Sequence, residues 1–108
     1  MPSNADSGSD LIVTLDVAQT LATISVAGNY LIKIDPTPLV ATETLFIEIF
    51  DKVLTGSTSQ LAYSGGVRAD QSDMQISIPL SVVFEMIVKI TQSNGTKRTF
   101  DWAVVDMS

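Results

Sequence analysis

Apolar and polar residues alternate along much of the chain with a period of two residues. Such a period places successive side chains on opposite faces of an extended backbone, so it predicts β-strands. No stretch shows a convincing helical period, and we expect little helix. The predicted strands cover residues 10–17, 20–27, 30–34, 44–54, 60–64, 74–78, 82–91 and 98–107.

Turn-forming residues separate these strands. The Gly28-Asn29 pair predicts a tight hairpin between the second and third strands. The Asn94-Gly95 pair predicts a type I′ turn in a final hairpin, since both residues easily adopt positive φ angles. Pro79 indicates an edge strand or a strand end, because proline cannot donate a hydrogen bond to a ladder.

The strand and turn pattern favours an all-β fold. About eight short strands with no convincing helix predict an antiparallel β-sandwich. An immunoglobulin-like or a jelly-roll-like strand order fits the pattern, and so does a small barrel. The first nine residues are small and polar and predict a flexible arm, residues 1–9. The remaining chain, residues 10–108, has a length that suits one domain.

Cysteine and histidine are both absent. Their absence excludes disulfides and thiolate metal sites, and it removes the commonest general base and the commonest metal ligand. Serine and threonine are plentiful, but no Gly-x-Ser-x-Gly elbow and no phosphate-binding glycine loop accompanies them. We therefore expect no catalytic residues, no cofactor and no metal site, and predict that the protein is not an enzyme.

The charge and hydropathy of the chain limit the classes of partner that we expect. The formal net charge is −6, and the six Lys and Arg residues are scattered along the sequence. A phosphate backbone repels such a chain, so nucleic acid is not an expected partner. No apolar run approaches the roughly 18 residues of a membrane span, and the start lacks a basic leader. We expect a soluble protein with no membrane partner.

Two weaker motifs suggest ligands. Trp102 and Tyr63 are aromatic residues of the kind that stack on sugars, although isolated aromatic residues usually belong to a core or an interface. Asp70 and Asp73 are possible oxygen ligands for calcium, but they lack the spacing of a known calcium loop. Solvated carboxylates explain the second motif more simply.

Two predicted strands, 44–54 and 82–91, carry large apolar side chains on both faces. If the face that includes Leu45 and Phe84 packs in the core, a second face points outward, where apolar residues alternate with complementary charges. This candidate interface comprises Phe46, Glu48, Phe50, Lys52, Val83, Glu85, Ile87 and Lys89.

Such a mixed face is typical of a subunit interface, and it would leave a sizeable exposed patch on a monomer. It favours a homo-oligomer, either a dimer or a trimer. The alternative is that a loop of the same chain, at residues 39–43 or 65–72, covers these side chains. The sequence leaves both interpretations open.

Most of the chain after the first nine residues resembles small structural proteins of tailed bacteriophages. The segments that carry the resemblance are residues 27–35 (AGNYLIKID), 45–65, 76–80 (ISIPL) and 91–102 (TQSNGTKRTFDW). The resemblance lies in layout rather than in a diagnostic motif, and it transfers no site residues.

This resemblance implies a β-sandwich made in the host cytoplasm that becomes part of the virion. Its implied role is a capsid decoration or cement subunit that binds the major capsid protein or another virion protein and stabilises the shell. A tail, collar or fibre component is an alternative, and so is a carbohydrate-binding or host-recognition module.

Overall fold

The computed structural model describes residues 3–40, 42–52, 56, 58–69 and 76–107. All of its regular elements are β-strands. They are β1 (Ser3–Leu11), β2 (Gln19–Ile24), β3 (Gly28–Ile34), β4 (Thr44–Lys52), β5 (Gln60–Arg68), β6 (Ile76–Val82), β7 (Glu85–Ser93) and β8 (Thr99–Asp106).

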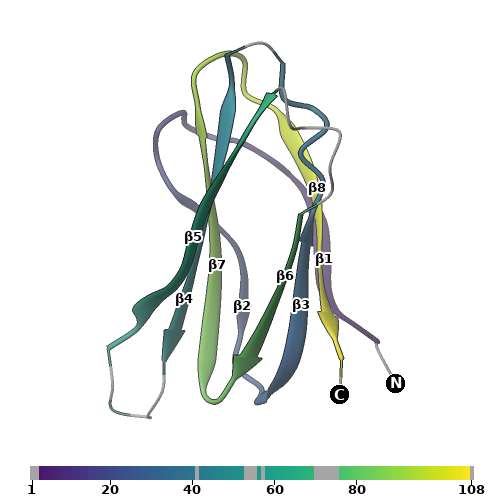
Figure 1. Ribbon diagram of the computed structural model, residues 1–108, viewed down its shortest axis with the longest axis vertical. Helices are drawn as coiled ribbons and strands as arrows, with labels where there is room; N and C mark the ends of the chain where they lie inside the picture. The colour runs from purple at the N-terminus through teal and green to yellow at the C-terminus, as the bar shows by residue number, and fades with distance from the viewer. Residues whose placement is uncertain (1–2, 41, 53–55, 57, 70–75, 108) are drawn as a thin grey trace.

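The strands form two antiparallel sheets of four strands each. Sheet I has the order β1-β8-β3-β6, and sheet II has the order β2-β7-β4-β5. The sheets pack face to face as a sandwich, with the strands running along the long axis of the molecule (Figure 1). The predicted all-β sandwich is confirmed, and the two sheets do not close into the alternative barrel.

The pairing of the strands is nested. The chain pairs β1 with β8, β2 with β7, β3 with β6, and β4 with β5, as one long hairpin would. That hairpin is rolled so that β8 also pairs with β3 and β7 also pairs with β4. Eight strands connected and rolled in this way form a jelly roll, which is one of the two sandwich orders that the sequence left open.

The core lies between the sheets and follows the period-two pattern. On β4 the inward side chains are Leu45, Ile47 and Ile49, and each is at most 1% exposed. The remaining fully buried apolar residues come from both sheets and include Ile32, Ile34, Met86, Val88, Ile90, Phe100 and Val104. Each such side chain contributes about 1.5–3 kcal/mol on leaving water, so this core is the main source of stability.

Both predicted hairpins are wrong, although the Asn94-Gly95 turn itself was predicted correctly. Asn94 and Gly95 have φ angles of 67° and 77°, as the turn prediction requires. However, β7 lies in sheet II and β8 lies in sheet I, so this turn crosses between the sheets. The Gly28-Asn29 pair likewise begins β3 after a crossing from β2. A turn sequence specifies local backbone angles and does not determine which sheet receives the next strand.

The predicted flexible arm is also wrong for residues 3–9. These residues belong to β1, which pairs with β8 from Ser3 opposite Asp106 to Leu11 opposite Thr99. Backbone hydrogen bonds can hold a strand of polar residues at a sheet edge, and composition gives no sign of them. Residues 1–2 of the predicted arm lie outside the described residues.

Several strand boundaries differ from the prediction. Residues 12–17 form a loop, whereas residues 65–68 extend β5 instead of forming one. The strand β6 continues through Pro79, and its place at the end of sheet I confirms the predicted edge strand.

Candidate functional site

Seven of the eight candidate interface residues share the outer face of sheet II. They alternate with the core residues of β4 and β7, the two central strands of that sheet. Six of the seven form three pairs that lie directly opposite one another across the two strands, one of them Phe50 and Ile87. We call this surface the outer patch; it consists of Phe46, Glu48, Phe50, Lys52, Glu85, Ile87 and Lys89.

The charges of the outer patch alternate in sign along and across the strands. Glu48 on β4 lies opposite Lys89 on β7, and Lys52 on β4 lies opposite Glu85 on β7. Opposite charges at such positions stabilise a sheet by about 0.2–1 kcal/mol per pair. The Lys89 ammonium also lies 5.3 Å from the centroid of the Phe50 ring, within cation–π range. The patch is therefore electrically neutral on a chain whose net charge is −6.

Phe46 is the most exposed aromatic residue of the outer patch. Its side chain is 46% exposed, and its ring lies over Gly66 of β5, where a Cβ atom would be 3.1 Å from the Phe46 Cδ1 atom. The missing side chain at Gly66 thus lets the ring spread over the neighbouring backbone. The apolar surface continues from the central strands onto β5.

Sequence reasoning missed Leu61, which extends this surface. The pairing of β4 with β5 shifts between Ile49 and Phe50, and after the shift Leu61 lies opposite Phe50. Leu61 is 51% exposed. A strict alternation along residues 60–64 could not reveal this irregularity, which depends on the partner strand.

In the described residues, the two loops proposed to cover the patch contact other parts of the fold. Leu39 is buried in the core, and residues 65–68 pair with the edge of β4. Residues 70–72 of the second loop lie outside the described residues. Phe46, on β4, remains exposed, so the described part of neither loop covers it.

Val83 does not belong to the outer patch. The strand β7 begins at Glu85, so Val83 lies in the connection from β6 and is 53% exposed there. Phe84, expected in the core, is also exposed by more than a third. The predicted strand began three residues too early because the alternation of size continues through this connection.

The sugar-binding motif is not assembled. Trp102 on β8 is only 8% exposed, and its indole nitrogen donates a hydrogen bond to Asp10 Oδ1 at 2.9 Å. Tyr63 lies on β5, in the opposite sheet. The two rings therefore form no common platform.

The proposed calcium ligands, Asp70 and Asp73, lie outside the described residues. Elsewhere, within the ranges that the structure describes, no group of three or more carboxylate, imidazole or thiolate side chains could hold a metal ion.

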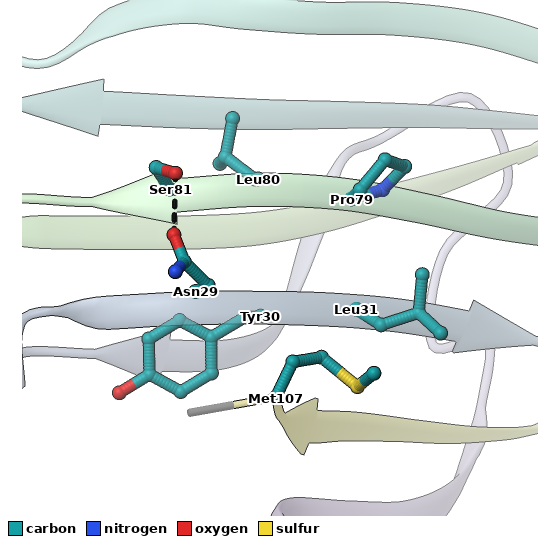
Figure 2. Close-up of a pocket in the computed structure, with 7 residues that line it drawn as sticks. All are labelled: Asn29, Tyr30, Leu31, Pro79, Leu80, Ser81 and Met107. Carbon is teal, nitrogen blue, oxygen red and sulfur yellow. Dashed lines mark hydrogen bonds between the residues drawn. The ribbon is translucent and has the colours of Figure 1, made fainter. Parts of the chain in front are cut away.

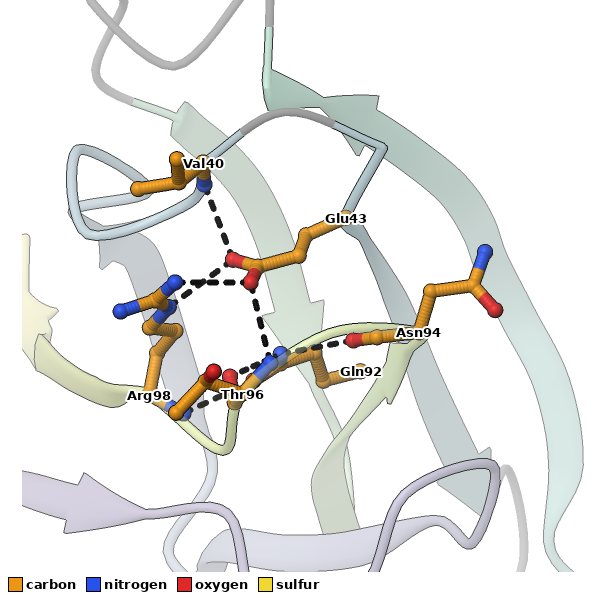
Figure 3. Close-up of polar contacts among 6 residues, drawn as sticks. All are labelled: Val40, Glu43, Gln92, Asn94, Thr96 and Arg98. Carbon is orange, nitrogen blue, oxygen red and sulfur yellow. Dashed lines mark hydrogen bonds and ion pairs between the residues drawn. The ribbon is translucent and has the colours of Figure 1, made fainter.

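A buried polar cluster joins the loops at one end of the sandwich (Figure 3). The Glu43 carboxylate is 4% exposed and accepts two hydrogen bonds from the Arg98 guanidinium, from Nε at 2.9 Å and from Nη2 at 2.8 Å. It also accepts hydrogen bonds from the backbone N–H groups of Val40, at 2.9 Å, and Thr96, at 3.1 Å. Glu43 thereby ties the β3–β4 connection to the β7–β8 connection.

Gln92 completes this cluster from inside β7. It takes the inward position after Met86, Val88 and Ile90, and it is fully buried. Its amide nitrogen donates to the backbone carbonyls of Asn94, at 3.1 Å, and Thr96, at 2.7 Å, while its amide oxygen accepts from the Arg98 N–H at 3.0 Å.

Gly95 leaves room for the Glu43 side chain. A Cβ atom at Gly95 would overlap the Glu43 carboxylate, and its φ of 77° favours glycine in any case. The Asn-Gly turn is thus required both by its backbone angles and by the packing of the carboxylate. The sequence alone predicts only the requirement for positive backbone φ angles.

The cluster makes stability depend on pH in a defined window. The hydrogen bonds from Arg98 are the main cause that lowers the pKa of Glu43 from 4.5 to about 2. Because the folded-state pKa is depressed, the stabilisation is fully present above pH 4.5 and is lost as the pH falls toward 2. We expect a loss of about 2 kcal/mol across this window, allowing for the partial exposure of Arg98.

Equilibrium denaturation between pH 5 and pH 2 measures this loss, with Glu43→Gln as the control. The variant keeps the shape of the side chain but cannot titrate. The free-energy difference between the wild-type chain and the variant should shrink as the pH falls below 4.5. A difference that stays constant down to pH 2 would show that Glu43 does not carry the effect.

An open hollow of about 370 Å³ lies over β3 and β6 of sheet I (Figure 2). The Ser81 hydroxyl donates to Asn29 Oδ1 at 2.6 Å across its floor. The Tyr30 hydroxyl donates to the Val26 carbonyl at 2.7 Å, and burial raises its pKa. The lining residues are Asn29, Tyr30, Leu31, Pro79, Leu80, Ser81 and Met107. Since the phenol is committed to a structural hydrogen bond, this lining offers no acid–base pair for catalysis.

Comparisons of the chain with protein-family models, curated proteins and solved structures give no match. The part of the chain that the structure describes holds no helix long and apolar enough to cross a membrane.

Proposed function

We propose that this chain is a non-enzymatic structural protein of a virion, a capsid decoration or cement subunit that acts as a homo-oligomer. The outer patch is the observation that carries the proposal. It presents aromatic and aliphatic side chains on a rigid pair of central strands, where a protein working alone would place polar residues. The resemblance to tailed-phage structural proteins supports the virion setting.

A second copy of the same chain suits the outer patch well. Two chains of charge −6 repel one another at long range, and a neutral surface is where that repulsion is weakest. A two-fold axis brings the same patch of both copies together, and the alternating charges allow each acid to meet a base. The apolar side chains between the charges, Phe46, Phe50 and Leu61, supply the buried contact.

An oligomer can bind a capsid through several weak contacts at once. After the first subunit binds, the others are held at high effective concentration, so avidity can exceed a single affinity by 10²–10⁴. Bridging neighbouring capsid subunits in this way resists their separation. A tail, collar or fibre component would use the same oligomer and is the second candidate. Burial of Trp102 weighs against a carbohydrate-binding module.

Charging the most exposed aromatic residue of the patch should dissociate the oligomer. In Phe46→Asp an uncompensated carboxylate replaces a half-exposed ring, and loss of an interface hot spot of at least 2 kcal/mol weakens association about 30-fold or more. Light scattering coupled to size exclusion measures the mass, and thermal unfolding measures the fold. Ser77→Asp, at an exposed position of β6 in the other sheet, adds the same charge as a control.

Phe46→Asp should give a folded species of lower mass, and Ser77→Asp should keep the mass of the wild-type chain. An unchanged mass for Phe46→Asp would remove the patch from the interface. Loss of the fold would place Phe46 in the core.

The virion setting has its own test. Quantitative mass spectrometry of purified particles of the encoding phage should find this chain in numbers comparable to the major capsid protein. A chain that is absent from those particles but abundant in the infected cell would contradict a decoration role.

A further inference from the structure

Asn94 and Gly95 form an exposed turn that rests on the buried polar cluster. Both residues are exposed, and their φ angles are positive, at 67° and 77°. The Asn94 side-chain amide points away from the cluster (Figure 3), and within the described residues no hydrogen bond holds it. Its carbonyl carbon, Cγ, is therefore open to attack by a neighbouring nucleophile.

The backbone nitrogen of the next residue is such a nucleophile. Gly95 has no Cβ atom to hinder the approach of its nitrogen to Cγ of Asn94. The other two asparagines of the chain, Asn4 and Asn29, precede residues that carry a side chain. Asn29 is also held by a hydrogen bond that its Oδ1 accepts from the Ser81 hydroxyl at 2.6 Å. Asn94 is therefore the asparagine of this chain whose neighbour obstructs the attack least.

The folded turn resists this attack. In the left-handed conformation of Asn94 the following nitrogen points away from the side chain, so ring closure requires the peptide group to rotate. Gln92 Nε2 holds the Asn94 carbonyl at 3.1 Å, and Gly95 lies so close to Glu43 that a Cβ atom would overlap the carboxylate. The charge of Glu43 also disfavours loss of the Gly95 N–H proton. The reaction therefore requires local opening of the turn.

We propose that Asn94 is a site of spontaneous deamidation and that the cluster of Glu43 and Gln92 limits its rate. The Gly95 nitrogen gives its proton to hydroxide from the solvent and bonds to Cγ of Asn94, and the bond from Cγ to the amide nitrogen breaks. That nitrogen takes up a proton and leaves as ammonia, which yields a five-membered imide. Water then opens the imide at either carbonyl carbon and leaves aspartate or isoaspartate at position 94. This chemistry does not depend on the assembly of the chain.

The isoaspartate product loosens the connection between β7 and β8. It lengthens the main chain by one methylene group, so the carbonyl that accepted from Gln92 is displaced and Gly95 no longer packs on Glu43 in the same way. It also places a new carboxylate near Glu43, and like charges repel. Deamidation at Asn94 is therefore an irreversible modification that weakens one end of the sandwich.

Peptide mapping by mass spectrometry measures the conversion of each asparagine during incubation in a mildly alkaline buffer. Asn94 should convert before Asn4 and Asn29, which serve as internal controls. Opening of the turn is fast relative to the reaction, so the rate follows the population of the open turn. The folded chain should therefore react about tenfold or more slowly at Asn94 than the same chain unfolded in urea.

Variants of the cluster test its part in the rate. Gln92→Leu and Glu43→Ala both release the turn, and each should raise the rate at Asn94 about tenfold or more. Gln60→Leu, at an exposed position of β5, should leave the rate unchanged. Thermal unfolding identifies any variant that is not folded, and Gln92→Leu is the milder of the two.

Two results would overturn the proposal. Conversion of Asn4 or Asn29 ahead of Asn94, or no conversion at Asn94 in any folded chain, would overturn the site. Equal rates at Asn94 in the wild-type chain and in Gln92→Leu would overturn its control by the cluster.

The stability of the product tests the loosening of the turn. Converted chains carry one more negative charge, so anion exchange isolates them from the starting chain. Because part of them contain isoaspartate, their midpoint in urea should lie below that of Asn94→Asp, which adds the same charge without lengthening the main chain. Equal midpoints would show that the modification does not weaken the connection between β7 and β8.

Discussion

Replacing Glu43 with alanine should destabilise the fold by about 3–5 kcal/mol. The substitution removes one partner of a buried ion pair and leaves the Arg98 guanidinium and two backbone N–H groups without their acceptor. A domain of this size has a total stability of about 5–15 kcal/mol, so the loss amounts to at least about a fifth of it. Urea denaturation should show a lower midpoint with an unchanged slope.

Glu48→Ala is the matched control for this prediction. Glu48 is the same residue type on the solvent side of β4, and an exposed charge pair contributes less than about 1 kcal/mol. Both substitutions are measured in the Phe46→Asp background, so that assembly does not contribute to either midpoint. Equal losses for Glu43→Ala and Glu48→Ala would show that the buried cluster has no special role.

The second large effect is expected for Gln92→Leu. Leucine fills a similar volume but leaves two carbonyl groups and the Arg98 N–H without their Gln92 partners. Each buried group that loses its partner costs about 1–3 kcal/mol, and water reaches part of this exposed turn, so we expect a loss of about 3 kcal/mol. Gln60→Leu, at an exposed position of β5, should change stability by less than about 0.5 kcal/mol.

The effects of Glu43→Ala and Gln92→Leu should not add. Thr96 donates its N–H to Glu43 and offers its carbonyl to Gln92, so either substitution alone releases the same turn. A double-mutant cycle should give a combined loss at least 0.5 kcal/mol smaller than the sum. Strict additivity would mean that the two side chains hold the β7–β8 connection independently.

The alternation of residues was a sound guide to which side chains share a face. Leu45, Ile47 and Ile49 are buried as the pattern predicted, and Glu48 and Lys89 are together on the outer face. A period of two residues follows directly from strand geometry, so it can be recognised in the sequence without knowing which strand is the partner. Most of the candidate interface could therefore be predicted.

Features that depend on pairing between distant segments could not be predicted from the sequence. Nothing local to Asn94-Gly95 indicates that β7 and β8 belong to different sheets. The shift that brings Leu61 beside Phe50 exists only in the pairing of β4 with β5. The ion pair between Glu43 and Arg98 joins residues 55 positions apart.

Two local signals in the sequence bear on the buried cluster and on β1. Gln92 occupies an inward position directly after Ile90 in the alternating run of β7, and a polar residue there must find hydrogen-bond partners. Gly8 alternates with polar residues, and it leaves space that the Trp102 ring fills. Reading these two positions as packing requirements would have pointed to the buried cluster and to β1.

The most direct test of assembly through the outer patch is the solution mass of the wild-type chain, measured by light scattering over a range of concentrations. One chain has a mass of 11.6 kDa. Assembly through the outer patch predicts a stable species of two or three times that mass. A single species of 11.6 kDa at the highest concentration would contradict self-assembly through Phe46, Phe50 and Ile87.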